Sequence, residues 1–365
     1  MSDSEVSRSN LMAISIEALY DGMFVQEEIY DADAVMLIAT PGVILNAESI
    51  ERIRSLNGGR DGIYVSRGTY KLLYERSQPV NVASRRDLEE NTGYAEAKDN
   101  TFELLDEIAQ HKVVQQKALQ TVSAELSARL EMTSPATILS LINALAPVDE
   151  YLQRHCVNVS LLNGLIGRWL GLPKKDVDTL VLIGLMHDCG KALVPPQILN
   201  AQRKLTGVEF EVIKMHPVYT YELLVGFHED VRRAARLHHE KINGDGYPDR
   251  LSNDSIPLEA RITAVSDIYD AMSSQRTYKK AQSPFHTLAM MSALKGSDLD
   301  SALVEVFHRY MPLELMNKPV MLSNGSVGVV RSFDSDDPEF PMIEVNNQII
   351  KSGKSLYCTS MYMRE

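Results

Sequence analysis

The sequence predicts a mainly α-helical protein in which an all-α domain lies between a small mixed α/β module and a β-rich C-terminal module. Between residues 135 and 315, apolar residues recur at helical spacing and strand-like runs are nearly absent. From residue 319 the pattern becomes β, because apolar runs at 320–322 and 327–330 flank Asn324-Gly325, a strong hairpin signal. The chain has 365 residues, 44% hydrophobic and 24% charged, which suits a globular protein of two or three domains.

Four segments are predicted, in chain order 1–80, 81–132, 133–315 and 316–365. The first combines strand-like runs with one helix, for which Asn46 is a suitable N-cap. Its strand-like runs lie at 23–25, 34–38 and 62–65. In the third, Thr206 with Glu209 predicts a capping box, and Ser283-Pro284 predicts a helix start. The last segment is expected to add a second pair of strands, at 342–345 and 348–350.

The segment 81–132 is predicted to contain a linker and an amphipathic helix. Residues 78–100 are polar and predict the linker, whereas 101–132 show helical periodicity. One face of that helix carries Leu119, Val122, Leu126 and Leu130. This stripe indicates either a helix packed on its own domain or a dimerising signalling helix, and it is too short to establish a coiled coil. Residues 1–130 carry no chemical motif, so we expect them to regulate or dimerise the protein, and we expect a chain starting near Thr133 to keep its activity.

Charge and composition argue against several partners and locations. The net charge of −12 is unfavourable for nucleic-acid polymers, which need a basic face. No run approaches the ~18 apolar residues of a membrane span, and the first residues lack the pattern of a signal peptide. The three cysteines are widely spaced and odd in number, which fits a reducing cytosol better than a disulfide framework. We therefore expect a cytoplasmic protein without a membrane span.

Histidine placement is the main chemical signal. Six of the nine histidines lie between residues 155 and 239. His187-Asp188 ends the most apolar helical segment, where a buried imidazole and carboxylate are costly unless a group such as a divalent metal satisfies both. Consecutive helical residues point about 100° apart, so His187 and Asp188 suit two adjacent ions, with Asp188 as a bridging carboxylate. The same argument applies to His238 and His239.

Four motifs in a fixed order make the sequence similar to the HD-GYP phosphodiesterases, a branch of the HD phosphohydrolases. They are His155 near a helix start, HDCGK at 187–191, HHEKINGDGYP at 238–248, and DIYDA at 267–271 followed by Arg276 and Lys279. His216, before Pro217, matches the histidine between the second and third motifs. A lone His-Asp pair is a weak signal, whereas this ordered set is specific. The resemblance covers about residues 135–315.

The resemblance implies a metal-dependent hydrolase with a defined set of site residues. The implied metal ligands are His155, His187, Asp188, His216, His238, His239 and Asp267. The implied catalytic residues are Asp188 and Lys191, and the implied substrate contacts are Lys191, Tyr247, Asp270, Arg276 and Lys279. Imidazole and carboxylate ligands without thiolates suit iron, manganese, nickel or zinc, and we expect iron or manganese.

Two of these assignments have alternatives. Lys191 lies one turn beyond His187, where a solvated lysine is also favourable against the helix dipole. Tyr247 belongs to a Gly-rich loop close to the ligands, where its ring can stack on a nucleobase. In the family, docking of a partner protein is the rival role of this GYP loop.

Two departures from the family pattern bear on the site. Asn243 stands where many members have Asp, at a position that is not a ligand, so only a turn-level effect is expected. Members with a third metal place a Glu four residues before the first histidine, and this chain has Tyr151 there. Glu150 is one position off and points about 100° away. We therefore expect two divalent metal ions per chain.

The sequence thus predicts an enzyme that hydrolyses cyclic di-GMP by attack of a hydroxide bridging two ions, with pGpG as the product and GMP as an alternative end product. Two alternatives remain: a phosphohydrolase for another cyclic dinucleotide, and a weakly active nucleotide-binding receptor. The presence of every expected ligand argues against the receptor. A homodimer and a signalling partner at the GYP loop are further hypotheses.

Overall fold

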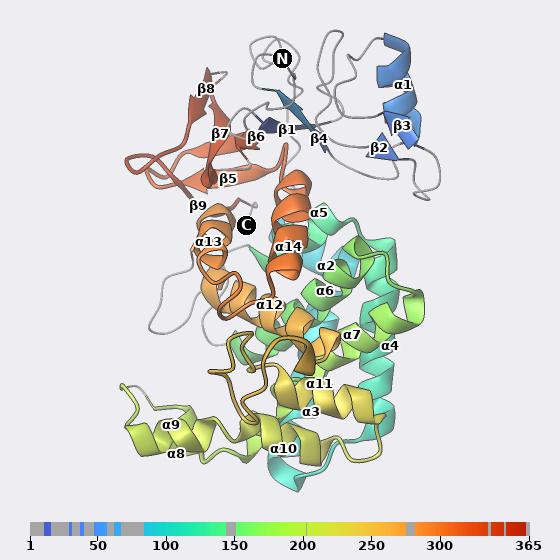
Figure 1. The fold of residues 1–365 in the computed structure, drawn as a ribbon, viewed down its shortest axis with the longest axis vertical. Coiled ribbons are helices and arrows are strands. Elements are labelled where there is room, and N and C mark those ends of the chain that lie inside the picture. The colour runs from blue at the N-terminus through green and yellow to red at the C-terminus, as the bar shows by residue number, and fades with distance from the viewer. Residues whose placement is uncertain are drawn as a thin grey trace.

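A body of helices lies below a small sheet, and α13 and α14 lead from one to the other (Figure 1). The computed structural model describes residues 11–15, 29–30, 37–39, 47–56, 62–66, 84–143, 151–201, 203–274, 282–334, 337–346 and 348–362. The prediction of a mainly α-helical protein with a β-rich C-terminal module is confirmed.

One hydrophobic core extends through the helical body, from Tyr94 in α3 to Met311 in α14. The helices are α2 (Arg85–Thr92), α3 (Tyr94–His111), α4 (Gln116–Met132), α5 (Pro135–Ile142), α6 (Tyr151–Trp169), α7 (Lys174–Met186), α8 (Pro196–Leu199), α9 (Gly207–Ile213), α10 (His216–Leu223), α11 (Glu229–Leu237), α12 (Leu258–Ser273), α13 (Pro284–Ser292) and α14 (Ser301–Glu314), with 3-10 helices η5 (Cys189–Leu193) and η6 (Asn253–Ser255). Helices α6 and α7 pack closely, and Leu162 and Val181 between them are fully buried. The predicted capping box of α9 and the predicted start of α13 are both confirmed.

The sheet joins strands from the two ends of the chain. Its strands are β1 (Leu11–Ser15), β4 (Gly62–Ser66), β5 (Pro319–Leu322), β6 (Val327–Asp334), β7 (Asp337–Val345), β8 (Gln348–Lys351) and β9 (Cys358–Met361). They pair in the order β4-β1-β6-β5-β9, and β7 pairs with β6 and β8. Both predicted strand pairs of the C-terminal module are confirmed. The pairing of β1 with β6, which sets Met12 opposite Asp334, was not predicted.

The described parts of the N-terminal segment match the prediction in part, because the strands Leu11–Ser15 and Ile29–Tyr30 were not expected. The expected helix is α1 (Ala47–Leu56), and the expected strand at 62–65 is β4. The strand expected at 34–38 is observed as β3 (Leu37–Ala39), which pairs with β2 (Ile29–Tyr30). The run at 23–25 and the expected cap Asn46 lie outside the described residues.

The predicted linker is wrong over residues 85–100, where the structure has α2 and the start of α3. Polar composition suggested a linker, but Tyr94, Ala97 and Thr101 recur at helical spacing and are buried. Gly93 separates the two helices with a φ of 64°. The polar residues are the outer face of amphipathic helices, a pattern that composition alone does not distinguish from a linker.

The apolar stripe on α4 packs inside the helical body. Its four residues, Leu119, Val122, Leu126 and Leu130, are buried in the main core, with α4 against α6 and α7. Of the two interpretations, the helix packed on its own domain is confirmed, and the stripe is not available for a dimer. Helices α3 and α4 share a core with residues 133–315, so the boundary expected at residue 133 is not a structural boundary.

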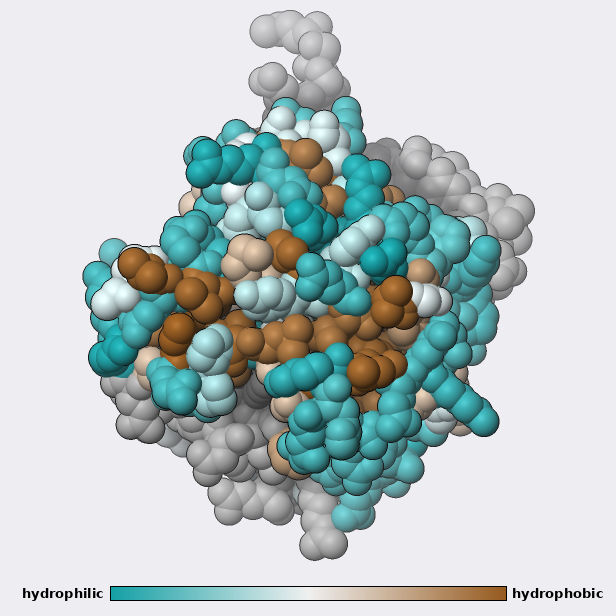
Figure 2. All heavy atoms as spheres, turned by 90° about the horizontal axis from the view of Figure 1, so that it is seen from below, coloured by the Kyte–Doolittle hydropathy of each residue, from teal (hydrophilic) through white to brown (hydrophobic). Residues whose placement is uncertain are grey.

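Apolar side chains are exposed on the face of the body opposite the sheet. Seen from that side, hydrophobic residues form a band across a largely polar surface (Figure 2). The exposed large apolar residues include Val208 and Phe210 of α9, with Met215 just beyond it.

Among the described residues, no helix has the length and apolar character needed to cross a membrane.

Candidate metal centre

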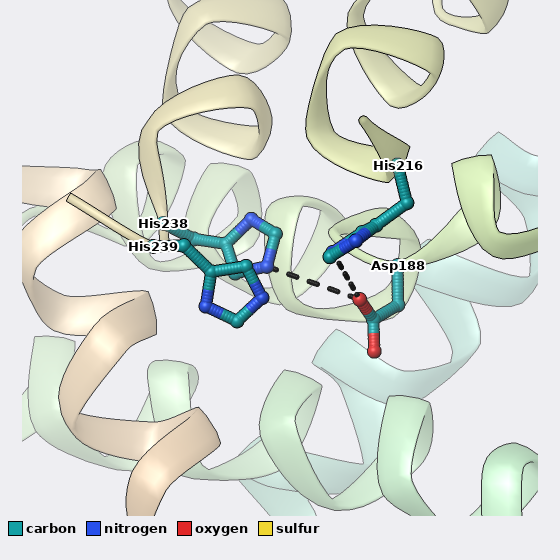
Figure 3. Close-up of side chains that lie close together, drawn as sticks. All are labelled: Asp188, His216, His238 and His239. Atoms are coloured by element: carbon teal, nitrogen blue, oxygen red, sulfur yellow. Dashed lines mark ion pairs between the residues drawn. The ribbon is translucent and has the colours of Figure 1, made fainter. Parts of the chain in front are cut away.

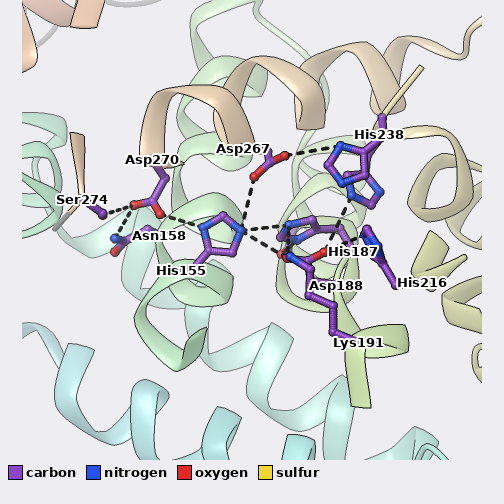
Figure 4. A network of polar contacts seen from close by, with 12 residues as sticks. His155, Asn158, His187, Asp188, Lys191, His216, His238, Asp267, Asp270 and Ser274 are labelled. Carbon is purple, nitrogen blue, oxygen red and sulfur yellow. Dashed lines mark hydrogen bonds and ion pairs between the residues drawn. The ribbon is translucent and has the colours of Figure 1, made fainter. Parts of the chain in front are cut away.

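Seven side chains from five places in the fold meet inside the helical body, and Figure 4 labels all of them except His239. His155 lies on α6, His187 and Asp188 follow α7, His216 starts α10, His238 and His239 follow α11, and Asp267 lies on α12. These are the metal ligands expected from the sequence, and the structure brings all of them together. Their donor atoms form two groups, with the atoms of each group within 4.8 Å of one another. The groups are His155 with His187 and Asp267, and Asp188 with His216, His238 and His239 (Figure 3).

Asp188 lies between the two groups. Its Oδ2 atom is 3.4 Å from Nε2 of His155 and 3.4 Å from Nε2 of His187. Its Oδ1 atom is 3.0 Å from Nε2 of His216 and 3.8 Å from Nε2 of His238. Each carboxylate oxygen therefore faces a different group, as expected for a carboxylate that bridges two ions.

Asp267 completes the first group and also borders the second. Its Oδ1 atom is 3.3 Å from Nε2 of His155, which in turn is 3.2 Å from Nε2 of His187. Its Oδ2 atom is 3.8 Å from Nδ1 of His239. Two carboxylates and five imidazoles thus enclose one small volume.

Backbone carbonyls orient three of the imidazoles. Nδ1 of His187, His216 and His238 lies 2.8, 2.7 and 2.7 Å from the carbonyl oxygens of Gly184, Ile213 and Ala235, respectively. Donation from Nδ1 leaves Nε2 unprotonated and directed into the site, the form in which histidine binds metals.

Three buried polar atoms in the site lack a hydrogen-bond partner among the described residues. They are Oδ1 of Asp188 and Nε2 of His216 and His238. Buried polar atoms without a hydrogen-bond partner are energetically costly. Nε2 of His216 and Oδ1 of Asp188 face each other, but both are acceptors, so no hydrogen bond can form between them. A divalent cation satisfies all three atoms, so the residues present fit a metal.

The electrostatics around His155 favour a cation. Burial opposes ionisation of Asp188 and Asp267, yet neighbouring basic groups hold the pKa of both carboxyls well below the usual value. These groups are Lys191 and His187 for Asp188, and chiefly His155 for Asp267. Burial also opposes protonation of His155, but the surrounding carboxylates hold its pKa well above the usual value. A position with such strong preference for positive charge suits a metal ion.

The second group supplies neutral imidazoles. Burial and the neighbouring imidazoles hold the pKa of His238 well below its usual value. Burial lowers the pKa of His239 to about 3, against the opposing charge of Asp267. Both rings therefore keep a lone pair at neutral pH, as metal ligation requires.

His238 and His239 serve the same group, so the expectation that they would serve different ions is wrong. Their ring centroids are 4.0 Å apart. The expectation assumed a continuous helix, but α11 ends at Leu237. Beyond the helix, adjacent side chains are no longer held about 100° apart.

Lys191 lies beside the ligands and not on a solvated helix end. Its ammonium group forms an ion pair with Oδ2 of Asp188, and its side chain is 24% exposed. The tight turn that carries it needs Gly190, where a Cβ atom would come within 2.1 Å of the carbonyl oxygen of His216. Thr220, which sequence reasoning missed, accepts from the Gly190 amide at 3.0 Å and donates to the His187 carbonyl at 3.1 Å.

The GYP loop places Tyr247 against the second group. The Tyr247 ring lies 4.7 Å from the His239 ring, centroid to centroid. Buried Glu240 holds the loop by accepting the backbone amides of Asp249 and Leu251 at 2.6 and 2.9 Å. At Gly246 a Cβ atom would come within 2.5 Å of the Glu240 Cα atom, so this position excludes a side chain.

Asn243 has the turn-level role expected of it. Its Oδ1 atom accepts the backbone amide of Asp245 at 2.9 Å, and the residue is exposed.

Asp270 is not placed to contact a substrate, which corrects the expectation for this residue. It is fully buried behind His155, and Oδ2 accepts from Nδ1 of His155 at 2.7 Å. Its Oδ1 atom accepts from Asn158 Nδ2 at 2.6 Å and from Ser274 Oγ at 3.0 Å. Both oxygens are engaged by the protein, so Asp270 orients a ligand (Figure 4). Nothing in the sequence pattern identified Asn158 as its partner.

The remaining expected substrate contacts, Arg276 and Lys279, lie outside the described residues, as do Glu150 and the side chain of Tyr151.

Comparisons with known proteins agree with this geometry. Residues 137–303 match the family model described as HD domain. The protein named cyclic di-GMP phosphodiesterase of Pseudomonas aeruginosa is 36% identical over 56% of this chain and 50% of its own length. The 3'3'-cGAMP-specific phosphodiesterase 2 of Vibrio cholerae is 31% identical over 48% of this chain and 35% of its own length. The chain thus spans half of one relative and about a third of the other.

The fold is also found in a solved structure. The HDG"Y"P protein of Bdellovibrio bacteriovorus superposes with a TM-score of 0.51 at 15% identity, covering 83% of this chain and 99% of that one. The helical fold, the ordered motifs and the paired His/Asp groups of this chain agree with its match to the HD domain over residues 137–303.

Proposed function

We propose that this protein is a cyclic di-GMP phosphodiesterase that works with two divalent metal ions. The observation that carries the proposal is the position of Asp188, whose two oxygens face two separate groups of imidazoles. The Pseudomonas relative bears this activity in its name. Hydrolysis of one phosphodiester bond opens the cyclic dinucleotide to pGpG, and hydrolysis of the second gives GMP.

Side chains of this chain are suited to bind and orient the substrate of this reaction. Bound divalent ions activate water and stabilise charge that develops on phosphorus. Lys191, partly exposed beside Asp188, is suited to donate to a phosphate oxygen. Tyr247, against His239, is suited to stack on a base. For Arg276 and Lys279, phosphate contact is proposed from their motif positions alone.

The test is turnover by purified full-length protein after anaerobic reconstitution with iron or manganese, followed by chromatography of the nucleotides. Cyclic di-GMP and 3'3'-cGAMP are compared at equal concentration. The second candidate substrate is favoured by the name of the Vibrio relative. Faster cleavage of 3'3'-cGAMP would replace the proposed substrate, and nucleotide binding without cleavage by metal-loaded protein would make the chain a receptor.

Elemental analysis of anaerobically purified protein is expected to find two ions of iron or manganese per chain. The donor atoms are imidazole and carboxylate, which suit these metals, and they form two groups. A third ion needs a further anionic ligand, and Tyr151 offers only a phenol with an ordinary pKa of about 10. Chelation should abolish turnover and lower the melting temperature, because a metal bound only by the folded state stabilises it. Three well-occupied ions would contradict the count.

Lys191→Ala is expected to keep both metals and lose about 10²–10³ in kcat, the scale for removing one donor that stabilises developing charge. Lys174→Ala is the matched control, because Lys174 is an exposed lysine on α7 paired with Glu131 and Asp178. Metal content, kcat and KM are measured for both variants. Unchanged turnover in Lys191→Ala would remove this residue from the proposed site.

The location and partners of the protein are also proposals. Cys156, Cys189 and Cys358 are free and buried, which supports a reducing compartment such as the cytoplasm. A signalling partner at the GYP loop is supported by the surface beside it, where Lys214 lies 5.8 Å from the Tyr247 ring and Phe210 is half exposed. A homodimer must use a surface other than the buried stripe of α4.

A further inference from the structure

We propose that Tyr94 is a positioning residue for His155, acting through Asn158 and Asp270. The inference rests on the proposed metal site and extends it to α3. The match to the HD domain begins at residue 137, so Tyr94 lies outside the matched segment.

Three hydrogen bonds join Tyr94 to the metal centre. The Tyr94 hydroxyl donates to Oδ1 of Asn158 at 2.5 Å, and Nδ2 of Asn158 donates to Oδ1 of Asp270 at 2.6 Å. Oδ2 of Asp270 accepts from Nδ1 of His155 at 2.7 Å. All four residues are buried, so water does not compete for these bonds. Figure 4 shows the last two steps.

The Tyr94 hydroxyl holds the oxygen end of the Asn158 amide, while Asp270 accepts from the nitrogen end. An amide has a donor end and an acceptor end of nearly equal size, and its orientation follows its partners. A phenol donor at one end and a carboxylate acceptor at the other fit one orientation only. Without the hydroxyl, the amide keeps its bond to Asp270 but loses the partner that holds its oxygen end, so the donor to Asp270 Oδ1 is less firmly placed.

His155 depends on this network more than the other ligands depend on theirs. Backbone carbonyls hold Nδ1 of His187, His216 and His238, whereas a side chain, that of Asp270, holds Nδ1 of His155. Nε2 of His155 faces Asp267, Asp188 and His187 only while Nδ1 stays hydrogen-bonded to Asp270. A change in the Asp270 carboxylate therefore reaches the first ligand group directly.

Tyr94 is itself firmly placed. It follows Gly93, whose φ of 64° sets the angle between α2 and α3. The Arg154 guanidinium lies 5.4 Å from the Tyr94 ring centroid and pairs with Glu89 of α2 at 3.5 Å. The junction of α2 and α3 thus fixes the hydroxyl that starts the hydrogen-bond series.

Tyr94→Phe removes only the hydroxyl. We expect one of the two metal affinities of the full chain to weaken about tenfold, the lower end of the range for residues that orient a metal ligand. The affinity at the second group should remain unchanged. The measurement is competition for Mn²⁺ with a chromogenic chelator, combined with elemental analysis, and it needs no nucleotide.

Tyr269→Phe is the matched control. Its hydroxyl is also buried and donates to an asparagine, Oδ1 of Asn143 at 2.6 Å, but it leads away from the ligands. Both variants should lose similar thermal stability, and only Tyr94→Phe should lose affinity for Mn²⁺. In an Asn158→Ala background, Tyr94→Phe should cause no further loss, because the residue through which it acts is gone.

Wild-type affinity in Tyr94→Phe, an equal loss in Tyr269→Phe, or additive losses in the double variant would each overturn the inference. Failure of the unmodified protein to bind Mn²⁺ would instead overturn the proposed metal site, and the inference with it.

Discussion

Asp188→Ala is expected to lose both metal ions and all turnover while keeping a folded helical body. Asp188 supplies one oxygen to each group of ligands, so its removal takes an anionic donor from both ions at once. The hydrophobic core does not depend on this side chain. Elemental analysis, circular dichroism and nucleotide turnover on the same preparation measure the three outcomes.

Asp178→Ala is the control for this substitution, since Asp178 is an exposed carboxylate of α7 paired with Lys174. It should retain both metals and full turnover. Full metal content and an unchanged rate in Asp188→Ala would show that the assigned centre is wrong.

Deletion of residues 1–132 is expected to destroy the fold, and with it all activity. This reverses the expectation from sequence, which treated the chain before Thr133 as dispensable. Ile108 of α3 and Leu119, Leu126 and Leu130 of α4 are at most 1% exposed. Loss of one such side chain costs about 2–5 kcal/mol, so the four together cost roughly 8–20 kcal/mol, as much as the roughly 5–15 kcal/mol that stabilises a domain. A soluble, folded and metal-loaded protein starting at Thr133 would contradict this.

A single substitution on α4 tests whether this helix stabilises the helical body without removing the whole segment. Leu126→Ala should lower the free energy of unfolding by about 2–5 kcal/mol. Met132 lies on the same helix but is 88% exposed, so Met132→Ala should change the free energy of unfolding by less than about 0.5 kcal/mol. Denaturant unfolding followed by circular dichroism measures both variants.

The ligands of the metal centre could be predicted from the sequence because few residue types bind metals and those types are recognisable in the sequence. Imidazoles and carboxylates buried at helix ends need a common partner, and few arrangements satisfy them. The order of the motifs gave the set, and the structure brings His155 and Asp267 together although they lie on α6 and α12. The helical class was predictable because its apolar periodicity is long and sustained.

The residues that orient the ligands could not be predicted in this way. Asp270 resembled a substrate contact, and its burial behind His155 depends on how α6 and α12 pack. Asn158 and Tyr94 show no pattern in the sequence, because a hydrogen bond between distant helices leaves no periodicity. The error at His238 and His239 followed from the exact end of α11, which sequence locates only to within a few residues.

The pairing of β1 with β6 determines when the sheet can be completed during synthesis of the protein. Met12 leaves the ribosome before the helical body, and its partner Asp334 follows only after that body has been made. Until then, β1 can pair only with β4, and its β6 side stays unpaired. A sheet of two strands is marginally stable in water, and an unpaired strand edge can pair with other chains. The newly made protein therefore passes through an aggregation-prone stage that ends when β6 closes the sheet.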